Sequence, residues 1–319
     1  MAIKNILLLG GSGFVGSHIA NLLSAREGIR ITVPSRRRER AKHLLPLPGV
    51  DVVEANINKE EDLLALMRGQ DAVINLVGIL HGDSEMPYGR KFAQAHVELP
   101  RKVVAAMQQA GVKRLVHMSA LKADAKGPSE YLRSKGDGEA IVLAAQGPLD
   151  VTVFRPSVIF GAGDSFLNTF AKLLKLAPVF PIDFPDARFQ PVCIDDVGQA
   201  FVDSLEDSDT FGQTYELCGP GVYSLRELIQ YTGKVIGKER PLFKLSEGWA
   251  YLQAGLLWLA PKPLMSPDNL RSMQVDNVAT PGAKTPARWC PASLESVAPT
   301  YLAADPNAKF NTFRGQAGR

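Results

Sequence analysis

The sequence predicts an α/β fold, a Rossmann-type doubly wound parallel sheet followed by a smaller C-terminal α/β substrate lobe. In the first half, short apolar runs alternate with helical stretches, and a Gly-rich turn follows the first run. Continuous apolar runs of this length are typical of strands that helices cover on both faces. Of the 319 residues, 45% are hydrophobic and 22% are charged, a globular composition that excludes disordered, collagen-like and disulfide-scaffold classes.

The apolar runs give the expected strands in order. They are Ile3–Leu9, Ile31–Val33, Val50–Val53, Ala72–Val77, Leu115–Met118 and Val151–Phe154. Helical patterns cover Phe14–Ala25, Glu60–Arg68, Arg90–Ala110 and Tyr131–Ala145. Pro100 lies within the third of these, and a proline at that place should kink the helix or divide it in two.

The second half is punctuated by proline from Pro156 onward. Three further helices are expected, at Phe166–Lys175, Asp196–Leu205 and Leu225–Ile236. We therefore expect two domains: a Rossmann domain over 1–155 and a smaller substrate or partner lobe over 156–319. Strands of the second part can rejoin the first sheet.

The turn after the first strand has the spacing of a phosphate-binding loop. Gly10, Gly13 and Gly16 follow an apolar strand and open a helix. The first glycine allows the tight turn, the second lets the backbone approach a pyrophosphate, and the third lets helix and strand pack closely. The free N–H groups at the helix N-terminus then face the phosphates. The motif, in this context, predicts dinucleotide binding.

The end of the second strand indicates which dinucleotide is bound. Arg36 stands about 20 residues beyond Gly16, where an NAD-binding protein carries Asp or Glu. A guanidinium can hold a 2′-phosphate through two hydrogen bonds. Ser35 and Arg36 therefore predict that NADP(H) is preferred, with NAD(H) as the alternative cofactor. A solvated basic surface is the other interpretation of this stretch.

Small and polar residues follow the next two strands. Asn56 comes after the third strand, where a side chain can reach an adenine ring, and Val77 and Gly78 come after the fourth. A small residue there leaves room for ribose and pyrophosphate. Because open α/β sheets bind ligands at the carboxyl ends of their strands, we expect these residues to line the cofactor site.

Tyr131 and Lys135 form a Y-x-x-x-K pair on a predicted helix. The i, i+4 spacing places both side chains on one face. A nearby ammonium stabilises a phenolate, so Tyr131 could exchange the proton that accompanies hydride transfer, and Lys135 could also hold the nicotinamide ribose.

The motifs together resemble the extended and atypical short-chain dehydrogenase/reductase superfamily, also called the NAD-dependent epimerase/dehydratase family. They are GGSGFVG, NLVG (Asn75–Gly78), YLRSK, FRPSVIFG (Phe154–Gly161) and FQPVCIDDV (Phe189–Val197). Within the superfamily, the sequence is most similar to the NAD(P)H-binding accessory subunits of respiratory complex I and their bacterial relatives. The resemblance implies cofactor contacts at Gly10, Ser12, Gly13, Phe14, Val15, Ser35, Arg36, Asn56, Ile57, Val77, Gly78, Tyr131, Lys135, Pro156, Ser157 and Val158.

Two positions depart from the superfamily pattern. Active members carry Ser or Thr after the fifth strand to polarise the carbonyl, and this position aligns with Ala120, which leaves Ser119 one place early. One place along a strand is the opposite face. Phe160 stands where nucleotide-sugar enzymes usually have Tyr, which weakens a sugar-nucleotide interpretation.

Charge and cysteine content limit the possible partners and location. The net charge of +3 gives no argument for a nucleic-acid partner. Three distant cysteines, without C-x-x-C spacing, fit a reducing cytoplasm and predict no metal site. The segment Trp249–Met265 is apolar but too short to span a bilayer. It could be buried, dock on a respiratory-chain protein, or place the protein peripherally on the inner face of the membrane.

Three functions agree with these features. The first is an NADP(H)-dependent oxidoreductase that moves hydride between nicotinamide and a carbonyl, an alcohol or a quinone-related substrate. Tyr131 is then the acid/base, Lys135 the ribose anchor and Ser119 the candidate polariser. The second is a non-catalytic nucleotide-binding accessory or assembly protein of respiratory complex I or quinone metabolism. The third is a sugar-nucleotide epimerase or dehydratase.

Overall fold

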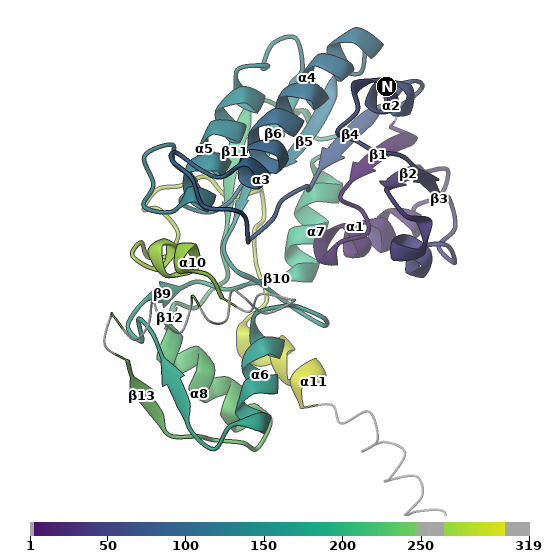
Figure 1. Cartoon of the computed structure of the whole chain (residues 1–319). Coiled ribbons are helices and arrows are strands. Elements are labelled where there is room, and N and C mark those ends of the chain that lie inside the picture. The colour runs from purple at the N-terminus through teal and green to yellow at the C-terminus, as the bar shows by residue number, and fades with distance from the viewer. Residues whose placement is uncertain (1–2, 246–247, 249–254, 256–264, 304–319) are drawn as a thin grey trace, which may run out of the picture.

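The structure, a computed structural model, describes residues 3–245, 248, 255 and 265–303. Its centre is a seven-stranded sheet in the order β11-β6-β5-β4-β1-β2-β3, with every pairing parallel (Figure 1). The strands are β1 (Asn5–Leu9), β2 (Arg30–Ser35), β3 (Val50–Glu54), β4 (Ala72–Asn75), β5 (Arg114–Met118), β6 (Asp150–Pro156) and β11 (Gln213–Leu217). Because β1 lies between β2 and β4, the strand order reverses there, which is where such sheets bind ligands.

Helices cover both faces of the sheet, as the continuous apolar runs predict. On one face, α1 (Phe14–Ser24) and α7 (Ile194–Asp203) pack against side chains that include Ile6 and Leu8. On the other, α2 (Glu60–Met67), α4 (Leu99–Ala110) and α5 (Glu130–Leu143) pack against Leu7 and Leu9. Successive residues of β1 thus point to opposite layers, and all four are fully buried. The Rossmann-type α/β fold is confirmed.

The stretch predicted as one helix over Arg90–Ala110 is divided. It begins with α3 (Arg90–Phe92), continues as a π-helical turn over Ala93–Glu98, and ends as α4. Pro100 lies in the first turn of α4, where the N–H that proline lacks is not required. The division therefore falls where the proline predicts it.

The seventh strand comes from the second half of the chain. β11 pairs with β6 from Gln213↔Thr152 to Leu217↔Pro156. The Phe154 ring of β6 packs against two other rings. Its centroid lies 4.7 Å from that of Phe201 on α7 and 5.8 Å from that of Tyr215 on β11. Residues beyond 155 therefore complete both the sheet and one of its helical layers.

The remaining described residues form a lobe below the carboxyl edge of the sheet in Figure 1. Two buried apolar clusters hold it together, centred on α6 (Leu167–Leu176), α8 (Leu225–Val235) and α11 (Leu294–Leu302). Its short strands are β7 (Ile159–Phe160), β8 (Phe180–Ile182), β9 (Arg188–Phe189), β10 (Val192–Cys193), β12 (Tyr223–Ser224) and β13 (Leu242–Lys244). A short helix, α10 (Pro267–Ser272), lies between this lobe and α5.

The predicted docking or membrane segment Trp249–Met265 falls almost entirely outside the described residues. Among the helices that are described, none combines the length and the apolar character needed to cross a bilayer.

Candidate functional site: a nucleotide site at the carboxyl edge of the sheet

The Gly-rich turn joins β1 to α1 in the conformation that phosphate binding needs. Gly10 has a φ of +82°, and a Cβ on it would lie 3.3 Å from the amide nitrogen of Val77. A Cβ on Gly16 would lie 2.3 Å from the carbonyl oxygen of Gly10, so only glycine fits. Gly13 is the N-cap of α1 and has no side chain to occupy the first N–H groups of the helix. The turn thus fits a pyrophosphate, and it lies against the end of β4.

The ends of β2 and β3 lie side by side. The Ala55 N–H donates to the Ser35 carbonyl oxygen at 3.1 Å, which brings Asn56 near Arg36 along this edge. The Ser35 hydroxyl donates to the Arg37 carbonyl oxygen at 2.8 Å. The Arg36 side chain is exposed and forms no ion pair with any residue in the described part of the chain. Its guanidinium is therefore available to a ligand.

Asn56 and Ile57 have local structural contacts as well. The Asn56 side-chain oxygen accepts from the Asn58 N–H at 3.2 Å, and its N–H donates to Asp62 at 2.9 Å. Ile57 packs on the edge of the cluster beneath α2 and α4. Their contacts to a cofactor stay predictions.

Lys135 is buried one turn below Tyr131 on α5. Its side chain is 5% exposed, and its Nζ donates to the Met118 carbonyl oxygen at the end of β5, at 3.1 Å. A Cβ on Gly78, in the loop after β4, would lie 3.2 Å from this Nζ, so the loop backbone passes close to the Lys135 amine. Burial lowers the pKa of Lys135 to about 8, whereas Glu139 opposes that shift. The structure therefore brings Gly78, Tyr131 and Lys135 together.

His96 is a site residue that sequence reasoning missed. It lies on the π-helical turn, and its Nε2 accepts from the Ile79 N–H at 3.0 Å. Nδ1 therefore carries the proton and donates to the Ser134 hydroxyl at 2.8 Å, which donates to the Tyr131 carbonyl oxygen at 2.9 Å. The His96 ring also meets that of Tyr131 edge to face, with centroids 5.6 Å apart.

One signal for His96 was present in the sequence. A Cβ on Gly138, inside α5, would lie 1.8 Å from the His96 carbonyl oxygen. A glycine within a helical pattern often marks such a close approach, although it does not say to what.

The charges around Lys135 agree with these hydrogen bonds. Burial, with the positive charge of Lys135 as a smaller cause, lowers the pKa of His96 to about 2 and that of His117 to about 3. His117 contacts the Asn75 side-chain nitrogen at 3.2 Å. Lys135 is thus a buried amine among neutral imidazoles. Burial also raises the pKa of Tyr131 to about 12.

The loop after β6 is held by a residue from far along the chain. The Asn277 side-chain oxygen accepts from the Ser157 hydroxyl at 2.6 Å and from the Val158 N–H at 3.1 Å. The Pro156 carbonyl oxygen accepts from the Leu121 N–H at 3.0 Å, which ties this loop to the end of β5. No local pattern in the sequence points to Asn277.

Comparison with known proteins agrees with this geometry. The NAD(P)H-binding family model matches residues 10–164. The 40 kDa subunit of NADH-ubiquinone oxidoreductase from Neurospora crassa is 28% identical over 286 residues, 87% of this chain and 72% of its own. Subunit 9 of the NADH dehydrogenase [ubiquinone] 1 alpha subcomplex from Mus musculus is 31% identical over 230 residues, 70% of this chain but only 59% of its own. UDP-glucuronic acid 4-epimerase from Bacillus cereus, solved with NAD, shares the fold at a TM-score of 0.65, with 16% identity over 85% of this chain and 100% of that one.

Residues 10–164 therefore form an NAD(P)H-binding domain, and its sheet has the Rossmann-type fold of the solved epimerase. The Gly-rich turn and the ends of β2, β3 and β4 lie along one edge of its sheet, and α5 carries the Tyr/Lys pair; their contacts to a nucleotide stay predictions.

Ser119 and Ala120 follow β5, at the place where the superfamily pattern predicts a polarising serine. Leu115 faces the α5 layer, so the alternation of β5 places His117 and Ser119 on that side as well. Ser119 is 2% exposed, and its hydroxyl has no hydrogen-bond partner within the described ranges. Ala120, at the aligned position, offers no donor. The Tyr131 hydroxyl also forms no hydrogen bond with the described residues, yet it is not sealed from solvent. The proton-donor role of Tyr131 and the polarising role of Ser119 therefore stay predictions.

Proposed function

We propose that this protein is an NADP(H)-dependent oxidoreductase that transfers hydride between the nicotinamide and a carbonyl or alcohol carbon. The observation that carries the proposal is the placement of Lys135, whose buried ammonium lies against Gly78 and one helical turn from Tyr131. A buried amine is costly to maintain, so its retention beside the phenol supports a chemical role.

Bound NADPH supplies the hydride in this scheme. Tyr131 donates its phenolic proton to the developing alkoxide oxygen, and the Lys135 ammonium stabilises the phenolate that is left. His96 holds the Tyr131 backbone through Ser134. The raised pKa of Tyr131 means that in the free protein the phenol is protonated near neutral pH, as a proton donor must be.

The segment between β4 and α3 supports an apolar substrate, including quinone-related ones. It exposes Leu80 (51%) and Met86 (81%), and the ring of the buried Phe92, on the α3 turn that follows, has its centroid 6.5 Å from that of Tyr131. Exposed apolar side chains beside a site favour an apolar ligand.

The preference for NADP(H) over NAD(H) is supported by Arg36. Its exposed side chain, which has no ion-pair partner in the described part of the chain, follows β2 at the position where an acid would otherwise hold the ribose 2′-hydroxyl.

A second function, a nucleotide-binding accessory role without turnover, is favoured by Ala120. The relatives named as complex I subunits agree with such a role. In that case NADPH is bound and retained, and a respiratory-chain protein is the partner.

The two functions are separated by following NADPH absorbance with purified protein and a panel of carbonyls and quinones. For the oxidoreductase we expect turnover that falls about 100- to 10,000-fold in Tyr131→Phe, with the Kd for NADPH retained. Tyr223→Phe removes a hydroxyl that binds Glu295 in the lobe and should keep its turnover. Retained NADPH without turnover on any acceptor would instead identify the accessory role.

A further inference from the structure

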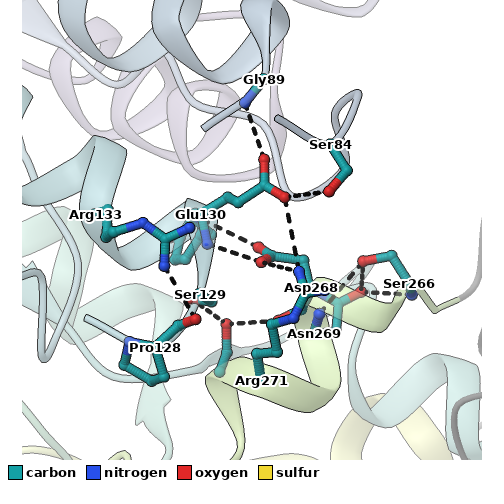
Figure 2. Close-up of polar contacts among 12 residues, drawn as sticks. Ser84, Gly89, Pro128, Ser129, Glu130, Arg133, Ser266, Asp268, Asn269 and Arg271 are labelled. Atoms are coloured by element: carbon teal, nitrogen blue, oxygen red, sulfur yellow. Dashed lines mark hydrogen bonds and ion pairs between the residues drawn. The ribbon is translucent and has the colours of Figure 1, made fainter. Parts of the chain in front are cut away.

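The first turn of α5 is capped by a carboxylate from a distant part of the chain. The N–H groups of Glu130 and Tyr131 donate to the two oxygens of Asp268, at 2.7 and 3.0 Å, across a separation of 138 and 137 residues. The Leu132 N–H donates to the hydroxyl of Ser129, the N-cap, at 3.1 Å. The N–H groups of the first three helical residues, which have no intrahelical partner, therefore each have an acceptor. Figure 2 shows Asp268 facing the start of α5.

The helix that carries Asp268 is itself fixed. Ser266 and Asn269 form a reciprocal cap at the start of α10. Leu270 is fully buried against Phe184 and Met265. At the other end of α10, the Ser272 hydroxyl donates to that of Ser129 at 2.8 Å. α10 therefore holds the start of α5 at two points and is anchored to the lobe.

Glu130 fastens the same turn from the opposite side. Its carboxylate accepts from the Ser84 hydroxyl and from the N–H groups of Glu85 and Gly89, in the segment that precedes α3 (Figure 2). The Arg271 guanidinium lies 3.7 Å from the carboxylates of both Glu130 and Asp268. One cation thus balances two buried acids, and three segments meet around the residue before Tyr131.

An ordinary cap does not require this arrangement. Ser129 already serves as N-cap, and Asp268 is only 8% exposed, so burying its charge costs free energy that a serine cap avoids. What Asp268 adds is a direct hydrogen bond to the backbone of Tyr131.

We infer that Asp268 is a positioning residue for Tyr131, through which α10 sets the place of the phenol relative to a substrate bound at the nicotinamide. The inference rests on the proposed hydride transfer. His96 and Asp268 then hold the Tyr131 backbone from its carbonyl side and its amide side.

The test is steady-state kinetics of Asp268→Asn and Asp268→Ala in the full chain, with NADPH and the best carbonyl of the panel. An asparagine keeps one acceptor oxygen and loses the other, so kcat should fall in the order wild type, Asp268→Asn, Asp268→Ala. For the alanine variant we expect a loss of about 10- to 100-fold, as for a small misplacement of a reacting group. The Kd for NADPH should not change, because the Gly-rich turn and Arg36 are untouched.

Two controls separate positioning from general loss of structure. Asp276→Asn makes the same change at another carboxylate in the lobe, which accepts from the Arg188 N–H at 3.2 Å, and should leave kcat unchanged. In a Tyr131→Phe background, Asp268→Ala should cause no further loss of rate. All rates are compared well below each variant's Tm, and if the alanine variant does not fold, the asparagine variant decides.

The failures are distinguishable. A folded Asp268→Asn or Asp268→Ala protein with wild-type kcat overturns the positioning role alone. A further loss in the Tyr131→Phe background also overturns it, because Asp268 would then act independently of Tyr131. A wild-type protein without turnover overturns the hydride transfer and this role together.

Discussion

No contact within the described residues gives the Arg36 side chain a structural role. It is exposed, it has no ion-pair partner there, and the neighbouring Ser35 hydroxyl is already bonded to the Arg37 carbonyl oxygen. Its position at the end of β2 is the one from which a side chain reaches the adenosine ribose. Removing it should therefore affect a ligand and leave the fold intact.

We predict that Arg36→Glu weakens NADPH binding by about 10- to 100-fold, because two charge-assisted hydrogen bonds are lost and a like charge is introduced. The Kd for NADH should not rise, since NADH has no 2′-phosphate and an acid at this position can accept from the ribose 2′-hydroxyl. Titration by nucleotide fluorescence gives both constants. Arg38→Glu, at the first residue of the 3₁₀ turn Arg38–Leu44, is the matched control and should bind NADPH as the wild type does. An equal loss for both nucleotides would contradict the assignment.

Residues whose role is encoded in local spacing could be predicted, and those held by long-range contacts could not. The glycines of the turn and the Tyr131/Lys135 pair follow from spacing on a predicted strand and helix. His96, Asn277 and Asp268 act on these elements from up to 138 residues away. Their neighbours in the sequence carry no sign of such contacts, because a single Asn, Asp or His fits many surface positions equally well.

At the scale of elements, the stretch Arg90–Ala110 also shows that local features can be predicted from the sequence and that long-range contacts cannot. Pro100 predicted the division of the stretch Arg90–Ala110, because the missing N–H acts locally. The π-helical turn before it was not predicted. It places His96 against α5, and that depends on the glycine at position 138, which belongs to a different helix.

Lys135, on α5, is a buried charge that lowers the free energy of unfolding. Burial lowers the pKa of Lys135 from 10.5 to about 8. Between these values the unfolded chain binds more protons than the folded one, so the free energy of unfolding rises with pH over this range. Below pH 8 the lysine is charged in both states, and the folded protein bears the full cost of burying it.

We predict that Lys135→Met, which keeps the length of the side chain but not the charge, increases the free energy of unfolding at neutral pH. It should also remove a pH dependence of up to about 1.4 kcal/mol per pH unit above pH 8. Urea denaturation across this range measures both, and Lys113→Met, at an exposed lysine, should leave the profile as it is. A Lys135→Met profile parallel to that of the wild type would show that the buried amine is not the cause.

At the scale of the whole molecule, the sheet is assembled from both halves of the chain. The family match ends at residue 164, yet β11 and α7 come later and supply Phe201, Tyr215 and Leu217 to the core on the α1 face. The alternation of strands and helices predicted six strands of the sheet. The seventh, Gln213–Leu217, begins with two polar residues, Gln213 and Thr214, which are only partly buried. It therefore lacks the continuous apolar run that predicts a buried strand.

The division at residue 155 thus has a testable consequence. We predict that a fragment of residues 1–164 neither unfolds cooperatively nor binds NADPH, although it contains every residue of the Gly-rich turn, Arg36 and the Tyr131/Lys135 pair. Without β11, the outer edge of β6 has no neighbour, and without α7 the face that Phe154 occupies is open to water, which exposes a large apolar area.

A fragment of residues 1–244 keeps both elements and should retain a cooperative transition. Circular dichroism during urea titration, with NADPH binding measured in parallel, compares the two. If residues 1–164 alone bound NADPH as tightly as the whole chain, the nucleotide domain would be independent of the second half, and the boundary would lie where the family match ends.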